Sequence, residues 1–387
     1  MRCRSRARRR CLHPRQPPPG NSRVHASARF SRAYLSHNRM EWWFGHLTTA
    51  LARHVEIVAC PMVRFNQPGH RVDADLSTLI DADGQPSFYL GSSDQLFGGI
   101  TELRMPTAIW SDYIPQSPAP VPAYFRLFDV VFYTQKDIGP VLRQAGLSQA
   151  EWLPFAFDAT LRNDPDAERI YDIGFVGSLE QPATRAERVQ VLARLEGKYR
   201  LNDYRRAAFG DDMMRVYNQS RIAVNVPVPG GFNMRTFEAM AAGALLLTRA
   251  VGNGQEDFFR DGVHLVTYRD SDDLIDKVDY FLRNDAERRE IAANGMREVL
   301  ARHTYDHRAA QLLETMTKST PARARDRAAR LSAYADFYDY LGRPDLLAAV
   351  ALARGVPPLK RLRLLTRAAV KCGRAAVDFR NRPELLA

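Results

Sequence analysis

The sequence predicts an α/β protein: two Rossmann-like domains that face one another across a cleft, followed by a helical C-terminal appendage. From residue 29 on, short apolar runs alternate with helical stretches, which is typical of parallel sheets covered by helices. A second alternation of the same kind starts after the polar stretch 162–168. Beyond residue 318 the chain is rich in Ala, Leu and Arg and shows only helical patterns. A length of 387 residues is enough for two or three domains.

The first half contains six short apolar runs bounded by turn residues, which predict buried strands. These runs are 33–36, 55–60, 87–90, 107–110, 130–133 and 152–154. Apolar residues at helical spacing predict helices over 42–53, 75–80 and 138–145.

The second half repeats this pattern. Strands are predicted at 173–176, 222–225, 245–248 and 264–268, with helices at 185–195, 211–219 and 235–242. Three strongly periodic helices, 272–283, 286–300 and 306–316, close this half.

The boundary between the halves falls near 157–166, where charge, Pro165 and a loss of periodicity coincide. We therefore expect a disordered basic leader (1–28), an N-terminal domain (29–160), a C-terminal domain (161–317) and a basic helical tail (318–387).

The positive charge lies at the two ends of the chain. The net charge is +11, but residues 1–39 carry 11 arginines and no acid, and residues 318–387 carry 15 basic and six acidic residues. The intervening part therefore has 29 basic against 38 acidic residues. An acidic middle argues against a nucleic-acid groove.

The expected cellular location follows from the lack of a membrane-spanning segment and of paired cysteines in the sequence. The longest apolar run, 239–248, has ten residues, too few to span a bilayer. Four widely spaced cysteines form no Cys-x-x-Cys pair, so we expect neither disulfides nor structural zinc, and a cytoplasmic protein. The basic, amphipathic segment 360–371 would either rest on the inner face of the membrane or form a solvated helix face.

The most informative segment is 225–248, where a strand, a Gly/Pro loop and a helix follow one another. The free N–H groups at a helix start favour an anion, and Gly230 and Gly231 allow close approach of a ligand. Arg235 could bind phosphate and Glu238 could accept hydrogen bonds from ribose hydroxyls. From spacing alone, Glu238 could equally be a partner of the helix dipole.

This segment resembles a known signature. The sequence FEAMAAGA at 237–244 is similar to the nucleotide-sugar motif of GT-B glycosyltransferases of the group 1 type, and most similar to the spore-maturation-protein (CgeB-like) branch. Further similar stretches are FDVVFYTQ (128–135), WLPFAFD (152–158), DIGFVGS (172–178) and HTYDHR (303–308).

The resemblance implies a GT-B fold, with the acceptor bound by the first half and the donor by the second. It implies that Glu238 binds the ribose and that Gly177 and Ser178, with Arg185 as first choice of cation, bind the diphosphate. Many relatives have a second glutamate eight residues before the first; here that position is Gly230. Asn233, Arg235 and Thr236 are therefore further donor-binding candidates, and the retaining mechanism of the paired form does not carry over directly.

A catalytic base would come from the first half. His37 follows the first predicted strand, His46 lies in the first helix, and Asp112 follows the strand that ends at Trp110. The Asp-x-Asp pairs at 73–75, 81–83 and 164–166 fit turns or helix starts, so we expect no metal site and no cofactor besides the donor.

The predicted function is metal-independent transfer of a sugar from a nucleotide sugar to a glycan, lipid-linked or protein acceptor. Two alternatives stay open. A nucleotide-sugar epimerase would have a similar donor site, and a scaffold protein would keep the pocket without the base.

Overall fold

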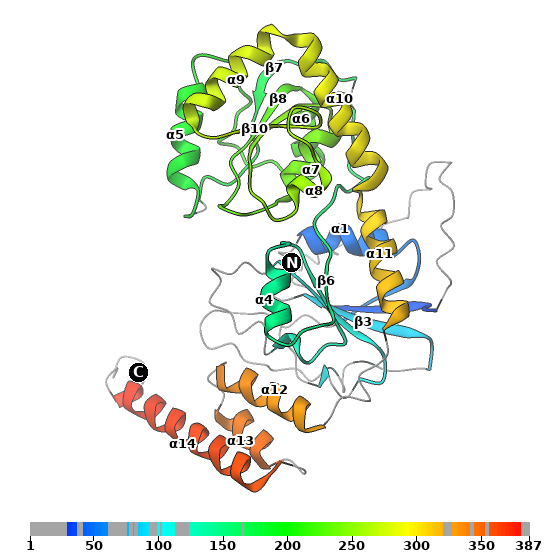
Figure 1. Ribbon diagram of the computed structural model, residues 1–387, viewed down its shortest axis with the longest axis vertical. Helices are drawn as coiled ribbons and strands as arrows, with labels where there is room; N and C mark the ends of the chain where they lie inside the picture. The colour runs from blue at the N-terminus through cyan, green and yellow to red at the C-terminus, as the bar shows by residue number, and fades with distance from the viewer. Residues whose placement is uncertain are drawn as a thin grey trace, which may run out of the picture.

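Two fully parallel sheets, each covered by helices, form the two halves of the chain in the computed structural model (Figure 1). The structure describes residues 29–36, 42–60, 76, 80, 84–92, 99–100, 103–112, 124–164, 166–180, 182–319, 327–340, 344–352 and 356–380. The predicted leader, most of the predicted helix 75–80 and His37 lie outside these residues.

The first sheet has the order β2-β1-β3-β4-β5-β6. Its strands are β1 (Arg32–Ser36), β2 (Glu56–Ala59), β3 (Ser87–Ser92), β4 (Thr107–Ser111), β5 (Val130–Tyr133) and β6 (Ala150–Trp152), and its helices are α1 (Trp42–Leu51) and α4 (Ile138–Gln144). Every residue of β4 and β5 is buried, because helices cover both faces of a parallel sheet. The unbroken apolar runs in the sequence reflect this burial.

The second sheet has the order β10-β9-β8-β7. Its strands are β7 (Tyr171–Gly174), β8 (Ser220–Asn225), β9 (Leu245–Arg249) and β10 (Val266–Tyr268). Its helices are α5 (Arg185–Leu195), α6 (Asp211–Asn218), α7 (Met234–Ala241), α8 (Gln255–Phe258), α9 (Ser271–Arg283) and α10 (Asp285–Arg302). The α7 and α8 helices lie on the side of this half that faces the first half (Figure 1).

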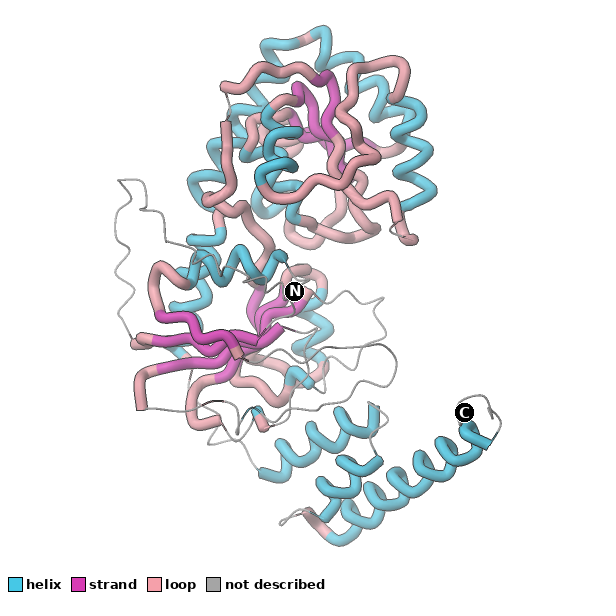
Figure 2. The backbone as a smooth tube through the Cα atoms, turned by 180° about the vertical axis from the view of Figure 1, so that it is seen from behind, coloured by secondary structure: helices cyan, strands magenta, loops and turns pink. Residues whose placement is uncertain are grey.

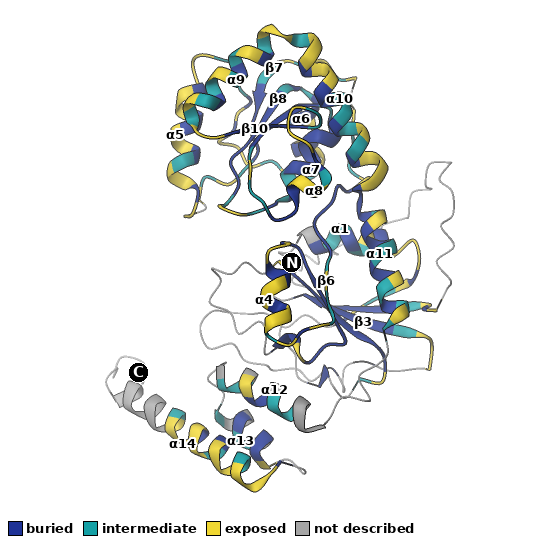
Figure 3. Cartoon of the chain, in the orientation of Figure 1, coloured by how far each residue is buried: buried dark blue, intermediate teal, exposed yellow. Residues whose placement is uncertain are grey.

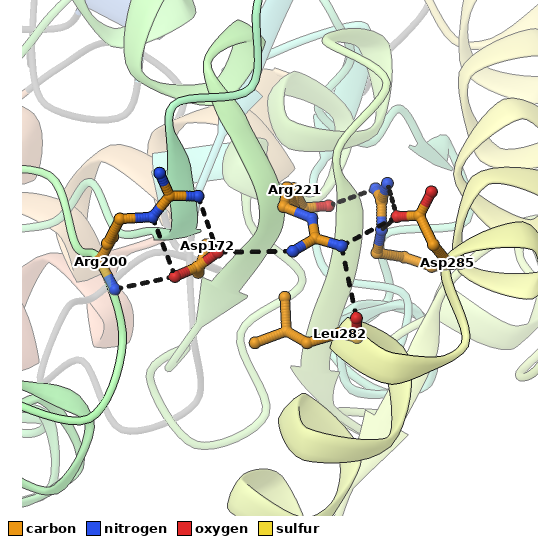
Figure 4. A network of polar contacts seen from close by, with 6 residues as sticks. Asp172, Arg200, Arg221, Leu282 and Asp285 are labelled. Carbon is orange, nitrogen blue, oxygen red and sulfur yellow. Dashed lines mark hydrogen bonds and ion pairs between the residues drawn. The ribbon is translucent and has the colours of Figure 1, made fainter.

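A charged network ties the amino ends of β7 and β8 to the start of α10 (Figure 4). Arg221 bridges Asp172 at 3.5 Å and Asp285 at 3.0 Å, and Arg200 pairs with Asp172. Hydrogen bonds from Arg288 and Arg221 lower the pKa of Asp285 to about 2. This end of the sheet is opposite to the carboxyl ends of the strands, where ligands bind in open α/β folds.

The chain crosses between the halves twice, and the two crossings run side by side. Phe157 N donates to His303 O and Tyr305 N donates to Phe157 O, each at 2.9 Å. The buried Arg308 donates from Nε to Pro154 O at 3.0 Å. After the second crossing, α11 (Tyr305–Lys318) packs against α1 on the first half, although its sequence lies in the segment that we assigned to the second.

One apolar cluster continues through this junction. It includes Trp110 and Phe155 from the first half, Tyr305 from the second crossing and Phe237 from α7. The Trp110 indole also donates to Leu153 O at 2.9 Å. The two halves thus share part of their core next to the crossings.

The C-terminal helices contribute to the apolar cluster on the other face of the first sheet. They are α12 (Arg327–Tyr340), α13 (Pro344–Leu352) and α14 (Pro358–Arg380). Tyr334, Leu347 and Leu364 share an apolar cluster with Tyr89 and Phe128 of the first half. These helices lie beside the first half and far from the second (Figures 1 and 2). The first part of α14, up to Cys372, carries many exposed residues (Figure 3).

The predicted fold class is confirmed, with local differences. The predicted strand 264–268 is shorter, because His264 and Leu265 belong to a turn in which His264 N donates to Arg260 O. The short helix α8 was not predicted. It lies between glycines and depends on tertiary packing, with the Phe258 ring stacked 4.9 Å from Trp152.

The packing of the second half can be tested at Gly295, with Gly45 of the first half as the control. A methyl group on Gly295 of α10 would lie 2.3 Å from His264 O, whereas one on Gly45 of α1 would meet nothing within 4 Å. We expect Gly295→Ala to destabilise the protein by about 1–3 kcal/mol, because the clash outweighs the helix propensity gained. Gly45→Ala should instead be neutral or stabilising by up to about 1 kcal/mol. Thermal and urea denaturation of both variants measure this; equal stabilisation by both would contradict it.

Candidate active site

The candidate site lies where β7 and β8 end and α7 begins. Both strands point their carboxyl ends at the same edge of the sheet, and the loop 226–233 leads from β8 into α7. Arg188 of α5 joins the two strand ends: its guanidinium donates to Val226 O at 2.8 Å and to Ser178 O at 2.6 Å. Burial and the nearby Arg235 lower the pKa of Arg188 to about 10.

Arg235 brings the two predicted donor-binding segments together. A Cβ placed on Gly177 would lie 3.6 Å from Arg235 Cζ, so the guanidinium lies within contact distance of this glycine. Among the described residues Arg235 has no ion pair within 4 Å. After burial, its charge is the next largest cause of the lowered pKa of Arg188, so the two guanidinium groups lie near one another. Two adjacent cations without a bound acid, at the start of a helix, favour an anion.

Glu238 lies one turn further along α7 and is only 1% exposed. Neither carboxylate oxygen has a hydrogen-bond partner. Burial raises the pKa of Glu238 to about 7, although the charges of Arg235 and His46 act in the opposite direction. A carboxylate enclosed without partners is ready to accept hydrogen bonds from a ligand.

The other predicted residues of this helix start face the sheet. Asn233 pairs its carboxamide with Asn225 at 3.1 and 3.3 Å, and Thr236 donates to Asn233 at 3.5 Å. No described side chain caps α7, since Asn233 is turned toward β8. Thr236 N donates to Asn233 O at 3.2 Å, and the two N–H groups before it, of Met234 and Arg235, are left to a ligand or to solvent.

Arg185 lies apart from this cluster. Its side chain is 64% exposed and is 3.9 Å from Glu180. Arg188, three residues on, occupies the buried position behind Ser178. The structure thus brings Gly177, Ser178, Arg235 and Glu238 together and leaves Arg185 at the rim.

His46 reaches the same region from the first half. Its Nδ1 is 2.5 Å from Asp158 Oδ2, and its ring stacks on Tyr305 with centroids 5.6 Å apart. Burial would raise the pKa of Asp158, but hydrogen bonds from His46 and Thr160 outweigh it and the pKa is lowered. His46 and Asp158 are both close enough for their charges to act on Glu238.

Asp112 follows β4 at the edge facing the loop 226–233. It accepts hydrogen bonds from Thr134 Oγ1 at 2.5 Å and from Gln135 Nε2 at 3.3 Å. Gln135 in turn contacts the backbone of Phe232. Sequence reasoning missed Asp158 and Gln135 as site residues, although each ends one of the stretches that carry the family resemblance.

The described residues include no group of three or more His, Cys, Asp or Glu side chains that could hold a metal ion. In the same part of the chain, no helix combines the length and apolarity needed to cross a bilayer.

The pKa of Glu238 predicts a pH effect on stability. The folded protein holds a proton on this carboxyl that the unfolded chain releases near its ordinary pKa of 4.5. The contribution of Glu238 to stability should therefore be complete below about pH 4.5 and fall by roughly 3 kcal/mol as the pH rises to about 7. Glu238→Gln should lack this part of the pH dependence. Urea denaturation of both proteins at pH 5 and pH 8 tests this, and parallel curves would refute it.

Comparisons with known proteins agree with this geometry. Residues 175–314 match a family model described as glycosyl transferase-like. No curated protein sequence matches the chain.

Solved structures share the fold at low identity. Sucrose-phosphate synthase from Thermosynechococcus elongatus is 15% identical, with a TM-score of 0.50 over 73% of this chain and 97% of that chain. HepE from Anabaena, solved with UDP, is 13% identical, with a TM-score of 0.53 over 74% and 100%. A UDP-forming trehalose-phosphate synthase from Burkholderia xenovorans is 11% identical, with a TM-score of 0.53 over 75% and 99%. The chain has the GT-B fold. The family match over 175–314 agrees with the predicted glycosyltransferase class.

Proposed function

We propose that this protein transfers a sugar from a nucleotide-sugar donor to an acceptor hydroxyl. The observation that carries the proposal is the position of Arg235, beside Gly177 and Arg188 and one turn before the buried Glu238. A nucleoside diphosphate has the matching groups: two phosphates for the cations and two ribose hydroxyls for the carboxylate. HepE was solved with UDP, so UDP is the first nucleotide to test.

In this proposal Arg235 and the first N–H groups of α7 bind the diphosphate and stabilise its charge as it leaves. Positioned donors of this kind lower the barrier most where charge develops. Glu238 holds the ribose, and the first half presents the acceptor. We expect the reaction to need no metal, and addition of EDTA to the assay tests that expectation.

His46 is the better placed base of the two described candidates. Asp158 favours the tautomer with the proton on Nδ1, which makes Nε2 the proton acceptor. The acceptor hydroxyl would give its proton to Nε2 as its oxygen attacks the anomeric carbon and the bond to the diphosphate breaks. That direct displacement inverts the anomeric configuration. Asp112, exposed at the edge of the first sheet, is the second candidate, and His37 stays a prediction.

The finer parts of the prediction are also proposals. Membership of the CgeB-like branch rests on the motifs at 237–244 and 303–308. The acceptor class (glycan, lipid-linked molecule or protein), a cytoplasmic location and the domain limits at 160 and 317 rest on the sequence. An epimerase or a scaffold protein stays open, because either would keep the donor site.

Donor binding has a direct test. We expect one of UDP, GDP or dTDP, or its sugar, to raise the melting temperature, because it binds only the folded protein. Arg235→Ala should weaken binding by about 10- to 100-fold, equivalent to roughly 1.5–3 kcal/mol. Glu238→Ala should weaken binding similarly, whereas Arg185→Ala should retain it.

The same panel separates the alternatives. A transferase releases nucleoside diphosphate, an epimerase changes the sugar without release, and a scaffold only binds. If no nucleotide shifts the melting temperature, the assignment of these residues to a donor site is wrong. If only the Arg185→Ala variant loses nucleotide binding, Arg185 rather than Arg235 would be the residue that binds the diphosphate.

The C-terminal tail supports a second part of the proposal, contact with an anionic membrane surface. Leu359 is 77% and Leu362 is 64% exposed on α14, three residues apart and so on one helix face. Arg363 and Arg367 are exposed on the same helix. Apolar side chains beside basic ones are typical of helices that lie on anionic lipid.

Vesicle sedimentation tests this contact. The full chain should bind vesicles that contain phosphatidylglycerol. It should dissociate from them at high salt, because salt screens the attraction between the charges. Leu359→Ser with Leu362→Ser should reduce binding at least about tenfold, since two side chains lose their burial in lipid. Val189→Ser, at an exposed apolar position on α5 of the second half, is the control. Equal binding by the double variant would leave α14 a solvated helix.

A further inference from the structure

The loop 226–233, which leads into the donor-binding helix, is held by two carboxamide side chains at the junction of the halves. The first is Gln135, which follows β5 in the first half and is 3% exposed. Its Oε1 accepts from Phe232 N at 3.0 Å and its Nε2 donates to Phe232 O at 3.3 Å. The side chain thus satisfies both backbone groups of one loop residue, as a neighbouring strand would.

Gln135 also connects this loop to the first half's acidic candidate. The same Nε2 donates to Asp112 Oδ1 at 3.3 Å, and Thr134 Oγ1 donates to the same oxygen at 2.5 Å. Phe232 directly precedes Asn233, the residue before α7. One buried amide therefore sets the position of Asp112 relative to the helix that carries Arg235 and Glu238.

The second carboxamide is Asn253, which is also buried. Its Nδ2 donates to Gly230 O, and its Oδ1 accepts from Asp137 N of the first half at 2.9 Å. Asn253 is the one described non-glycine residue with positive φ, at 54°, and lies between Gly252 and Gly254. A backbone in the left-handed region is uncommon outside glycine, and asparagine tolerates it best. The strained position keeps an amide where glycine would fit the backbone more easily.

Gly254 brings this second loop against the first half. Its φ is +88°, and a Cβ there would lie 2.4 Å from the Trp152 ring. Gly230 O and both backbone groups of Phe232 are therefore satisfied from the junction rather than from within the loop, which contains two prolines and two glycines.

We infer that Gln135 and Asn253 are positioning residues that fix the loop 226–233, and with it Arg235 and Glu238, in register with the acid–base groups of the first half. This inference rests on the proposed function. It separates two steps: the nucleoside diphosphate binds to groups of the second half, whereas the reaction requires both halves in register.

The variants are chosen to remove the amides with little other change. Gln135→Met keeps the length of the side chain without its hydrogen bonds. Asn253→Gly keeps the left-handed backbone and removes the amide, whereas Asn253→Asp keeps the acceptor for Asp137 N and loses the donor to Gly230 O. Lys136→Ala is the matched control, because its ion pair with Asp257 also joins the halves but both side chains are largely exposed.

The experiment compares nucleotide binding with turnover in the full chain. Calorimetry gives the Kd of UDP, or of GDP or dTDP if that nucleotide binds instead. The rate at which the nucleotide sugar is hydrolysed, with water as the acceptor and the nucleoside diphosphate as a product, gives kcat. Gln135→Met and Asn253→Gly should lower kcat at least tenfold and change Kd less than threefold, with Asn253→Asp between them and the wild type. Lys136→Ala should change both values less than twofold.

Three results would overturn the inference. Unchanged kcat in folded variants would make the amides merely structural. If a variant binds the nucleotide more weakly by the same factor by which its kcat falls, the amides would be part of the donor site. A wild-type protein that binds no nucleotide would refute the proposed function itself, and the inference with it. Melting temperatures of all variants identify any that fail to fold.

Discussion

A carboxylate without hydrogen-bond partners, enclosed at the junction of two domains, is the constraint on which the site depends. Glu238 is buried, and charges from both halves act on it. A carboxylate buried in this way must hold a proton or receive compensation from a ligand and nearby cations. The same burial that makes the site costly to maintain makes each hydrogen bond from a ligand stronger.

The arginines around the site divide into two kinds. Arg188 and Arg308 are buried, and both donate hydrogen bonds to backbone carbonyls. Arg188 thereby links two strand ends, and Arg308 links the two chain crossings. Arg235 has no such carbonyl partners among the described residues and adds its charge next to that of Arg188. The structural arginine thus fixes the loops and raises the local positive potential, while its neighbour stays available to an anion.

Several contacts fix the position of the two halves relative to one another. Two chain segments run side by side through the crossing, bonded between Phe157, His303 and Tyr305. The shared apolar cluster lies beside them, and polar contacts from Gln135 and Asp137 lie toward the loops. The C-terminal helices pack on the far face of the first sheet, so they extend its core without entering the site.

The sequence by itself determined the fold class and the donor segment. Alternating apolar runs and helical periods are local signals, and α5 spans the same residues, 185–195, that the periodicity predicts. The pattern around Glu238 also follows from local order, because strand, glycine loop and helix start are consecutive in the chain.

Only the tertiary structure decided which side chains meet. Arg185 and Arg188 occupy the same helix and are equivalent by residue type, yet one is exposed and the other buried. Arg185 is the first residue of α5, whereas the guanidinium of Arg188 lies against the backbone of Ser178 and Val226. Asp158 and His46 are 112 residues apart, and Gln135 and Phe232 are 97 apart. Such pairs arise from the packing of two separate sheets, and no local pattern in a single sequence encodes that distance.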